Sequence, residues 1–331
     1  MRVTIKDVAQ AANVSVSTVS RVLANKDNFF ASKTADHVRQ VATKLGYQRN
    51  AYAADLASHT SDMLAVVISA TKSNFADDII AGIHEVAAKH GNSVIILYAG
   101  ENNPTLQNKA IQTVIERDAM AVLIVALELG PESLANLKAS GIPHVFLSTA
   151  AKENLGPFIA SDDHAIGYEA TKFLIEHGHR QIGLVGMDEQ SFVGSQRIDG
   201  YRQAMAEAQL PVNDNWLIPG YFTFEDGETA MKHFGPHPDV TAIIANSDLT
   251  AIGVIDQARD FKLDVPKQLS VMSIDGTKLT RIFRPTITSV TQDFFQIGRD
   301  GCEALLTADK QSVNSQFLPI KIVERDSTRT L

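Results

Sequence analysis

The stretch NVSVSTVSRVLANKDN, residues 13–28, groups several hydroxyl side chains around valines and a single arginine. Serine, threonine and valine are mediocre helix formers, so helix propensity alone does not explain their choice. Small hydroxyl donors near the start of a helix can reach DNA phosphates, whereas arginine can pair with guanine through two hydrogen bonds. The candidate phosphate contacts are Ser15, Thr18 and Ser20, and the candidate base contacts are Val16, Ser17 and Arg21. A three-helix structural domain with solvated serines is the alternative interpretation.

Three short amphipathic segments are expected to hold this stretch. Thr4 with Asp7 resembles a capping box at the start of a first helix. Ser15 can begin a second helix, and a third is expected over residues 32–45, closed by Gly46. Two short helices joined by a tight turn, with a third behind them, form a helix-turn-helix. The apolar positions with helical spacing are Ile5, Val8, Ala9, Ala12, Val19, Val22, Leu23, Val38, Val41, Ala42 and Leu45.

The rest of the chain alternates apolar runs with amphipathic stretches. Strand-like runs begin at Met63, Ser93, Ala121, His144, Gln181, Thr241 and Leu269. Helical patterns between them stop at glycines such as Gly91 and Gly178. Near-continuous apolar strands that alternate with helices predict parallel sheets covered on both faces. So many units over about 270 residues indicate two similar subdomains rather than one sheet.

Charge is distributed unevenly along the chain. The net charge is −8, but residues 1–60 carry +4, because eight lysines and arginines stand against four aspartates, which leaves −12 for the rest. A basic head on an acidic body favours a DNA-reading head and a body that does not bind phosphate. Chance asymmetry is the alternative.

Composition also indicates the cellular compartment and whether a disulfide or a membrane span is expected. Cys302 is the single cysteine, so no internal disulfide is possible and a reducing compartment is expected. The N-terminal segment MRVTIKDVAQ has no apolar core typical of a secretory signal, and no apolar run reaches the roughly 18 residues of a membrane span. We therefore expect a cytoplasmic protein without a membrane partner.

Sequence motifs of common enzymes are missing from the chain. It contains no GxSxG, GxxxxGK[ST] or HExxH motif and no set of metal-binding cysteines. The histidines of KHG, EHGH and KHFGPHPD are interpreted as solvated helix ends, with a metal site as the weaker alternative. We expect no catalytic residues, no cofactor and no metal.

The segment VTIKDVAQAANVSVSTVSRVLANKD, residues 3–27, resembles the start of the LacI/GalR family of bacterial transcriptional regulators. The motifs that carry the resemblance are T-I-K-D-V-A, A-x-V-S-x-x-T-V-S-R-V-L and L-G-Y, and the likeness continues along essentially the whole chain. It implies that Val16 and Ser17 help to set operator choice and that Arg21 reads bases. The candidate DNA contacts are Thr4, Ser15, Val16, Ser17, Thr18, Ser20, Arg21, Asn25, Asn50, Ala53 and Leu56.

The segment YQRNAYAADLASHTSD, residues 47–62, is similar to the family's hinge, Y-R-P-N-A-x-A-R-x-L. Arg49 replaces the usual proline and Ala54 the usual arginine, which removes a rigid φ angle and a possible phosphate contact. The implied hinge helix, residues 50–58, is shorter than the roughly 12–15 residues that a lone helix needs. We expect it to fold only against its dimer mate on DNA, where Leu56 would wedge into the minor groove. A packing leucine in a linker is the alternative.

The resemblance implies a small all-α helix-turn-helix head on a two-lobed α/β body of the type I periplasmic-binding-protein kind. The expected divisions are a DNA-binding domain (1–48), a hinge (49–60) and an effector-binding and dimerisation domain (61–331). Within the last, the N-lobe is expected at about 61–161 and 291–325 and the C-lobe at about 162–290. Ligands of such sheets bind beyond the carboxyl ends of the strands, here between the lobes.

Polar and aromatic residues that follow the predicted strands are the candidate effector contacts. The resemblance implies that Arg197 and Asp275 stand at the positions that most often bind the ligand in this family. Their chemistry suits the hydroxyls of a small polyol. Asp248 is equally a candidate helix N-cap, and the candidate phenylalanines are alternatively core residues. Ile274 and Gly276 depart from the family pattern and put the local loop in doubt. The effector candidates are Ser69, Phe75, Asp162, Arg197, Phe222, Asp248 and Asp275.

The predicted function is a repressor that binds a palindromic operator as a homodimer and responds to a small effector, chosen as a sugar or sugar phosphate. A purine- or nucleoside-responsive repressor and a catabolite-control regulator switched by a phosphorylated carrier protein are the alternatives, so a protein corepressor stays possible. A solute-binding protein for transport would share the body, but it would need a signal peptide and no basic head. No leucine heptad follows the tail PIKIVERDSTRTL, so no tetramer helix is expected.

Overall fold

The computed structural model describes residues 3–23, 32–47, 61–69, 75–100, 103–150, 155–307 and 313–331. The chain divides into two compact units, Met1–Ser61 and Asp62–Leu331. The predicted hinge helix and the candidate contacts Asn25, Asn50, Ala53 and Leu56 lie outside the described residues. Among the described residues, no helix combines the length and the apolar character needed to cross a membrane.

The head folds as three helices, α1 (Ile5–Ala12), α2 (Val16–Leu23) and α3 (Ser32–Lys44). The predicted capping box is present, because Asp7 N–H donates to Thr4 Oγ1 at 3.4 Å and Thr4 N–H donates to Asp7 Oδ2 at 2.7 Å. Asn13 then ends α1 in the left-handed region at φ 52°. The buried core residues are Val8, Ala9, Ala12, Val19, Val22, Ala35, Val38 and Ala42.

Leu45, the last apolar position of the third predicted helix, is not buried in the head core. Leu45 follows the last residue of α3 and is 37% exposed. The chain turns at Gly46, whose φ is 66°, and Tyr47 N–H donates to Ala42 O at 2.9 Å. The Tyr47 side chain packs, partly buried, against the head core.

The body contains two six-stranded sheets. The first sheet has the order β11-β5-β4-β3-β1-β2 and the second β12-β10-β9-β8-β6-β7. All of their pairings are parallel except that of β10 with β12. The first sheet consists of β1 (Met63–Ser69), β2 (Ser93–Ala99), β3 (Ala121–Val125), β4 (His144–Leu147), β5 (Phe158–Ser161) and β11 (Gln316–Leu318). The second consists of β6 (Ile182–Met187), β7 (Leu217–Pro219), β8 (Ala242–Ala245), β9 (Ser270–Asp275), β10 (Thr288–Thr291) and β12 (Lys321–Val323).

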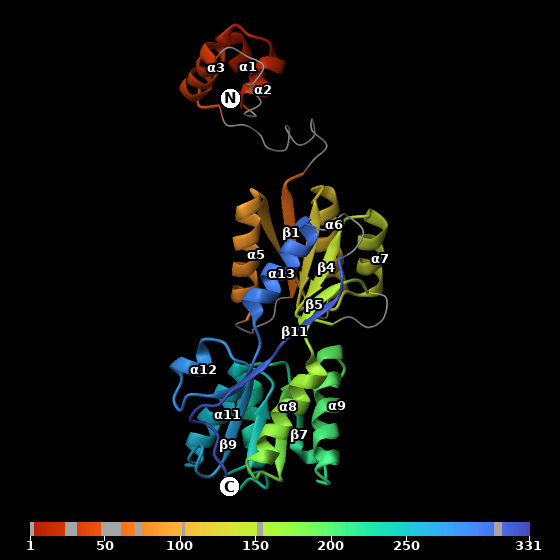
Figure 1. The fold of residues 1–331 in the computed structure, drawn as a ribbon, viewed down its shortest axis with the longest axis vertical. Helices are drawn as coiled ribbons and strands as arrows, with labels where there is room; N and C mark the ends of the chain where they lie inside the picture. The colour runs from red at the N-terminus through yellow and green to blue at the C-terminus, as the bar shows by residue number, and fades with distance from the viewer. Residues whose placement is uncertain are drawn as a thin grey trace. The chain divides into compact units, whose positions relative to one another are not determined.

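The first lobe is the first sheet with its helices. Strand alternation sends Leu64, Val66 and Ile68 to one face, where they pack with α5 (Ala76–His90) and α13 (Phe294–Thr307). Ala65 and Val67 face the other way, toward α6 (Pro104–Glu116) and α7 (Pro131–Ser140). Figure 1 shows α13, near the end of the chain, beside α5 in this lobe. The near-continuous apolar strands are therefore explained by burial on both faces.

The second lobe repeats this arrangement around the second sheet. Helices α8 (Asp163–Glu176) and α9 (Phe192–Glu207) pack as one pair, and α10 (Phe224–Phe234) and α11 (Asp248–Asp260) as another. The short helix α12 (Leu279–Ile282) follows β9, and a 3₁₀ turn (Asp214–Trp216) precedes β7. All seven predicted strand runs are strands of the two sheets, whereas β5, β7, β10, β11 and β12 had no matching prediction.

The chain passes between the lobes three times. The crossings follow β5, β10 and β11, after which β12 joins the second sheet. The N-lobe was predicted to include the chain up to about residue 325. In the structure, the chain from β12 onward packs on the second lobe instead. Leu331 N–H, for example, donates to His177 O at 2.9 Å.

One of the predicted solvated histidines is buried instead. His179 has no exposed surface, and its ring nitrogens bond to Thr241 Oγ1 at 3.0 Å and to Arg329 O at 3.1 Å. Burial lowers the pKa of this imidazole below its ordinary value. His179 thus ties the chain end to the second sheet, which the short motif EHGH did not indicate.

Candidate functional site

A cavity of about 340 Å³ lies between the two lobes. Its walls come from the residues directly after the strands: Ala126 after β3, Ser148 after β4, Asp188 after β6, Asn246 after β8 and Gln292 after β10. The carboxyl ends of parallel strands are where open α/β sheets bind ligands. The volume falls within the usual range of small-molecule sites, roughly 300–1,000 Å³.

Backbone strain is concentrated at this cavity. Eight described non-glycine residues have positive φ, and four of them follow helix ends, where this conformation is common. The other four all line the cavity: Ala126 (φ 46°), Ser148 (φ 58°), Phe222 (φ 63°) and Asp275 (φ 105°). Such conformations cost energy and persist where the surrounding structure enforces them, typically at binding sites.

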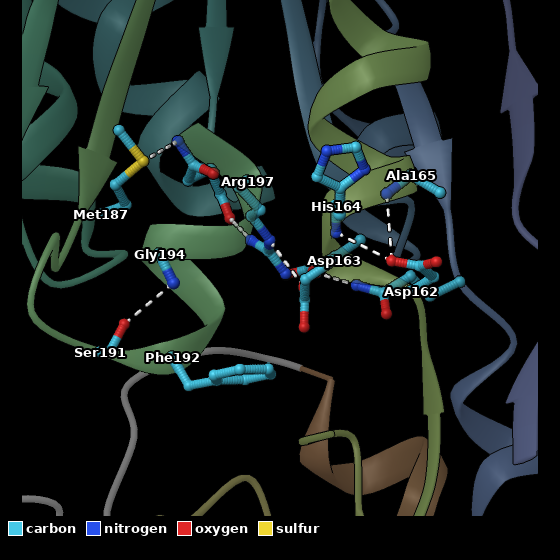
Figure 2. A network of polar contacts seen from close by, with 12 residues as sticks. Asp162, Asp163, His164, Ala165, Met187, Ser191, Phe192, Gly194 and Arg197 are labelled. Carbon is cyan, nitrogen blue, oxygen red and sulfur yellow. Dashed lines mark hydrogen bonds and ion pairs between the residues drawn. The ribbon is translucent and has the colours of Figure 1, made fainter. Parts of the chain in front are cut away.

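Arg197 of α9 is the buried cation of the cavity wall, with 6% of its surface exposed. Its Nε donates to Asp163 Oδ1 at 2.9 Å, and its Nη1 donates to the backbone carbonyl of Asn246 at 3.0 Å. The guanidinium lies 5.8 Å from the ring centre of Phe222. Figure 2 shows Arg197 pointing toward Asp163 of the neighbouring helix. Burial raises the pKa of Asp163, and the charge of Arg197 opposes that rise.

Close packing of α8 against α9 sets the position of this ion pair. Gly167 of α8 lies so near the backbone carbonyl of Arg197 that a Cβ there would collide with it. Gly200 of α9 makes the same kind of approach to His164 O. The two glycines let the helix backbones meet, so a side chain as short as Asp163 reaches the guanidinium.

Asp275 ends β9 and is the buried carboxylate of the cavity wall. Gln292 Nε2 donates to Asp275 Oδ1 at 2.9 Å. Burial raises the pKa of Asp275 to about 7, with a further contribution from the charge of Asp248, while Arg197 acts in the opposite direction. The carboxyl group therefore changes charge near neutral pH.

Asp248 differs from both roles considered for it. The N-cap of α11 is Ser247, whose Oγ accepts from Thr250 N–H at 3.0 Å. The Asp248 carboxylate accepts from Ser273 Oγ and Thr277 N–H, both at 2.6 Å, and is not part of the cavity wall. It holds the loop between β9 and α12, and its charge also contributes to the raised pKa of Asp275.

Two further candidates also lie away from the cavity wall. Asp162 is the N-cap of α8, where its Oδ1 accepts from His164 N–H at 3.0 Å and Ala165 N–H at 3.2 Å (Figure 2). Ser69 is buried at the end of β1. Neither residue is among those that line the cavity, so the structure does not bring them together with Arg197 and Asp275.

Aromatic rings form the apolar part of the wall. Phe75 and Phe294 of the first lobe stack with ring centres 4.7 Å apart and planes 20° apart, and Phe222 lines the second lobe. The candidates Phe75 and Phe222 thus border the cavity as well as the hydrophobic cores. The structure brings four of the seven effector candidates to one cavity: Phe75, Arg197, Phe222 and Asp275.

In the head, α2 presents its hydroxyls and arginine on the surface. Val16 is 42% exposed, and Ser17, Ser20 and Arg21 are also exposed, opposite the buried Val19 and Val22. Ser15 Oγ accepts from Thr18 N–H at 3.1 Å and lies 2.7 Å from Ser17 Oγ. The Ser15 hydroxyl therefore serves first as a helix cap, which partly explains why so many hydroxyls open this helix.

Comparisons with known proteins agree on one family. Residues 4–50 match the family "Bacterial regulatory proteins, lacI family", and residues 171–328 match a "Periplasmic binding protein-like domain". Catabolite control protein A of Priestia megaterium is 31% identical over 99% of this chain and 100% of its own. The chain belongs to the lacI family.

Two solved structures show the same body. A transcription regulator from Lactobacillus plantarum is 43% identical with a TM-score of 0.75, over 81% of this chain and 100% of its own. The regulator CCPA from Weissella paramesenteroides, with bound glucose, is 28% identical with a TM-score of 0.74, over 81% of this chain and 99% of its own. This lacI-family protein is a DNA-binding transcription regulator with a helix-turn-helix head and a two-lobed α/β body.

The departure of Gly276 from the family pattern has a structural reason. Gly276 has φ 71°, and a Cβ there would collide with Thr291 Oγ1. Its N–H donates to Asp248 Oδ1 at 3.3 Å, so the glycine belongs to the loop that Asp248 holds. Ile274, the other departure, is fully buried in the core of the second lobe.

Sequence reasoning missed most of the polar cavity wall. The missed residues are Glu128, Ser148, Thr149, Asp188, Gln190, Ser191, Asn246 and Gln292. All but Gln292 follow strand runs that had been predicted, at β3, β4, β6 and β8. The same strand-end rule, applied to every run, would have found them.

Proposed function

We propose that this regulator is a repressor controlled by a small sugar-like effector that binds in the cavity between the lobes. The observation that carries the proposal is the convergence of Arg197, Asp275, Phe75 and Phe222 on one cavity from both lobes. A carboxylate accepts from hydroxyls, a guanidinium donates to sugar oxygens, and aromatic rings cover apolar sugar faces. The CCPA relative with bound glucose supports a sugar.

The proposed mechanism is a shift between two arrangements of the lobes. An effector that contacts both lobes favours one arrangement, which changes whether the hinge helices of a homodimer order on a palindromic operator. Such coupling is typically worth about 1–3 kcal/mol and acts in both directions between effector and operator. The protein would work as a binder without catalysis, in the cytoplasm, where the operator is.

Fluorescence anisotropy on a labelled DNA fragment from upstream of the protein's own gene tests the proposal. We expect tight, sequence-specific binding at fixed salt that one compound of a panel of sugars, sugar phosphates, nucleosides and purines changes. Arg21→Ala should cost about 1–3 kcal/mol of discrimination against scrambled DNA. Arg202→Ala, which changes an exposed arginine of α9 in the body, is the control and should change nothing.

Other outcomes separate the alternatives. Tight binding that ignores the whole panel would favour control by a partner protein, a second candidate suggested by the similarity to catabolite control protein A. Loss of all sequence preference in the unmodified protein would contradict the proposal and direct attention to Arg49 and Ala54.

A further inference from the structure

The charges around the cavity are mostly negative. Among the described residues that line it, Glu128, Asp188 and Asp275 are acidic, whereas Arg197 is the single cation. The charge of Arg197 is already matched by Asp163 at 2.9 Å. An anionic ligand would therefore face more acidic than basic groups along the described wall, which disfavours its binding.

One helix N-terminus at the cavity that could receive an anion is already occupied by a side chain of the protein. The N-terminus of α9 faces the cavity, and helix N-termini bind phosphates through free backbone N–H groups. Here Phe192 N–H donates to Glu128 Oε1 at 2.7 Å across the lobes, and Gly194 N–H donates to Ser191 Oγ at 3.0 Å. The protein's own carboxylate thus occupies the place of a phosphate.

The cavity instead offers hydrogen-bond acceptors. Asp275 Oδ1 accepts from Gln292, which leaves Oδ2 for a ligand. Buried acceptors without partners favour a ligand that brings O–H or N–H donors.

We propose that the effector is an uncharged compound dense in hydroxyl donors, with one apolar face, and that this cavity rejects phosphorylated sugars. The apolar face would lie against Phe75 and Phe222, and the hydroxyls would reach Asp275. The inference rests on the proposed effector role of the cavity, and it narrows that role from sugars and sugar phosphates to unphosphorylated sugars and related polyols.

Isothermal titration of the full-length protein with matched pairs tests the inference. The probes are glucose and glucose 6-phosphate, fructose and fructose 1,6-bisphosphate, and ribose and ribose 5-phosphate, together with unphosphorylated disaccharides, polyols and nucleosides. We expect one unphosphorylated compound to bind and its phosphate ester to bind about 100-fold more weakly or worse. An ester that binds as tightly as its parent, or a panel in which no unphosphorylated compound binds, would overturn the inference.

Charge-removing variants test the stated cause. The double variant Glu128→Gln, Asp188→Asn should reduce the ratio of affinities between the unphosphorylated sugar and its phosphate ester by about 10-fold, because both removed charges face the cavity. Glu116→Gln, which removes an exposed charge outside the cavity wall, is the matched control. An unchanged gap in a variant that denatures in urea like the wild type would overturn the electrostatic explanation.

Operator binding of the same samples keeps the two proposals apart. If the protein binds its operator specifically and an ester is the ligand that releases it, the narrowing to uncharged effectors is wrong and the proposed function stands. If uncharged sugars bind the cavity but do not change operator affinity, the proposed effector role is wrong, and the inferred preference for uncharged ligands is still supported.

Discussion

The two lobes share one architecture, but they contribute different chemistry to the cavity between them. The second lobe supplies polar groups that are already fixed, since Arg197 makes two hydrogen bonds and Asn246 Nδ2 is bound to the neighbouring strand. The first lobe supplies the stacked pair Phe75 and Phe294 and the small Ala126, together with the polar residues that follow β3 and β4, which are Glu128, Ser148 and Thr149. We therefore expect the second lobe to determine which ligand binds and the aromatic pair of the first lobe to cover it.

Backbone strain is shared equally between the two lobes. Each lobe places two residues with positive φ at strand ends or in the loops that follow, Ala126 and Ser148 in the first and Phe222 and Asp275 in the second. The fold therefore brings both lobes to the cavity with similar backbone geometry. What differs is the side chain at each strained position, which is small in the first lobe and aromatic or acidic in the second.

The largest effect is expected from Arg197→Ala. The substitution leaves Asp163 buried without its cation, which should lower the free energy of unfolding by about 3–5 kcal/mol at pH 8 in urea denaturation. Effector affinity, measured by calorimetry, should fall by about 100-fold or more, since the guanidinium lines the cavity.

A double variant and a neighbour check this result. The double variant Arg197→Ala, Asp163→Ala should recover much of the stability, because it removes the unpaired buried carboxylate. It should not recover effector affinity, because it does not restore the hydrogen-bond donors of Arg197. Arg202→Ala on the exposed side of α9 should change neither quantity. An Arg197→Ala protein that binds effector normally would place recognition elsewhere and break the division between the lobes.

The next effect concerns the carboxyl group of Asp275, whose pKa is raised to about 7. A raised pKa means that the folded protein holds the proton more tightly than the unfolded chain does, so stability falls as pH rises from about 4 to 7. Asp275→Asn removes this penalty while keeping an oxygen that accepts from Gln292. We expect a gain of about 2–4 kcal/mol in the free energy of unfolding at pH 8, and a smaller gain at pH 5.

The same variant should lose function while gaining stability. An amide oxygen is a weaker acceptor for sugar hydroxyls than a carboxylate, so effector affinity should fall by about 10-fold at pH 8. For the wild type, effector affinity should weaken as pH falls below 7, because Asp275 takes up a proton. Calorimetry at several pH values measures both, and equal affinity of wild type and variant at pH 8 would contradict the role of Asp275.

Much of the fold could be predicted because burial leaves a strong pattern. Strands buried on both faces must be apolar throughout, so runs such as MLAVVIS from Met63 are conspicuous. The short strands β7, β11 and β12 have three residues each, too few to show a pattern. Because β12 was too short to be predicted, the first lobe was predicted to continue past the point where the chain crosses to the second lobe for the last time.

The candidate site was only partly predictable because polar residues have several possible roles. Arg197 and Asp275 lie at the cavity, whereas Asp162 and Asp248, of equal chemical type, cap a helix and hold a loop. Strand-end position predicts a place near the cavity edge, but it does not reveal where the carboxylate finds its hydrogen bonds. That choice depends on neighbours distant in sequence, such as Thr277 for Asp248.

A smaller effect is expected from the first lobe. Phe75→Leu removes the ring stacked on Phe294 and should weaken effector binding by about 3–10-fold, in keeping with the roughly 0.5–1.5 kcal/mol of an aromatic pair. The preference among sugars should not change, because the second lobe would still choose the ligand. Phe317→Leu, on β11 and outside the cavity wall, is the control. A changed sugar preference in the Phe75 variant would give the first lobe a role in selection.

The smallest effect is expected where the lobes touch each other. Glu128 of the first lobe accepts from Phe192 N–H at the start of α9, so its charge also interacts favourably with the helix dipole. Glu128→Gln keeps an acceptor but removes the charge, which should cost about 0.3–1 kcal/mol of lobe closure. Effector release in stopped-flow should then become about 2–5-fold faster, with an unchanged rate in Glu116→Gln. If release does not change, the hydrogen bond at Phe192 does not contribute to closure, and the aromatic cover of the first lobe is sufficient to retain the ligand.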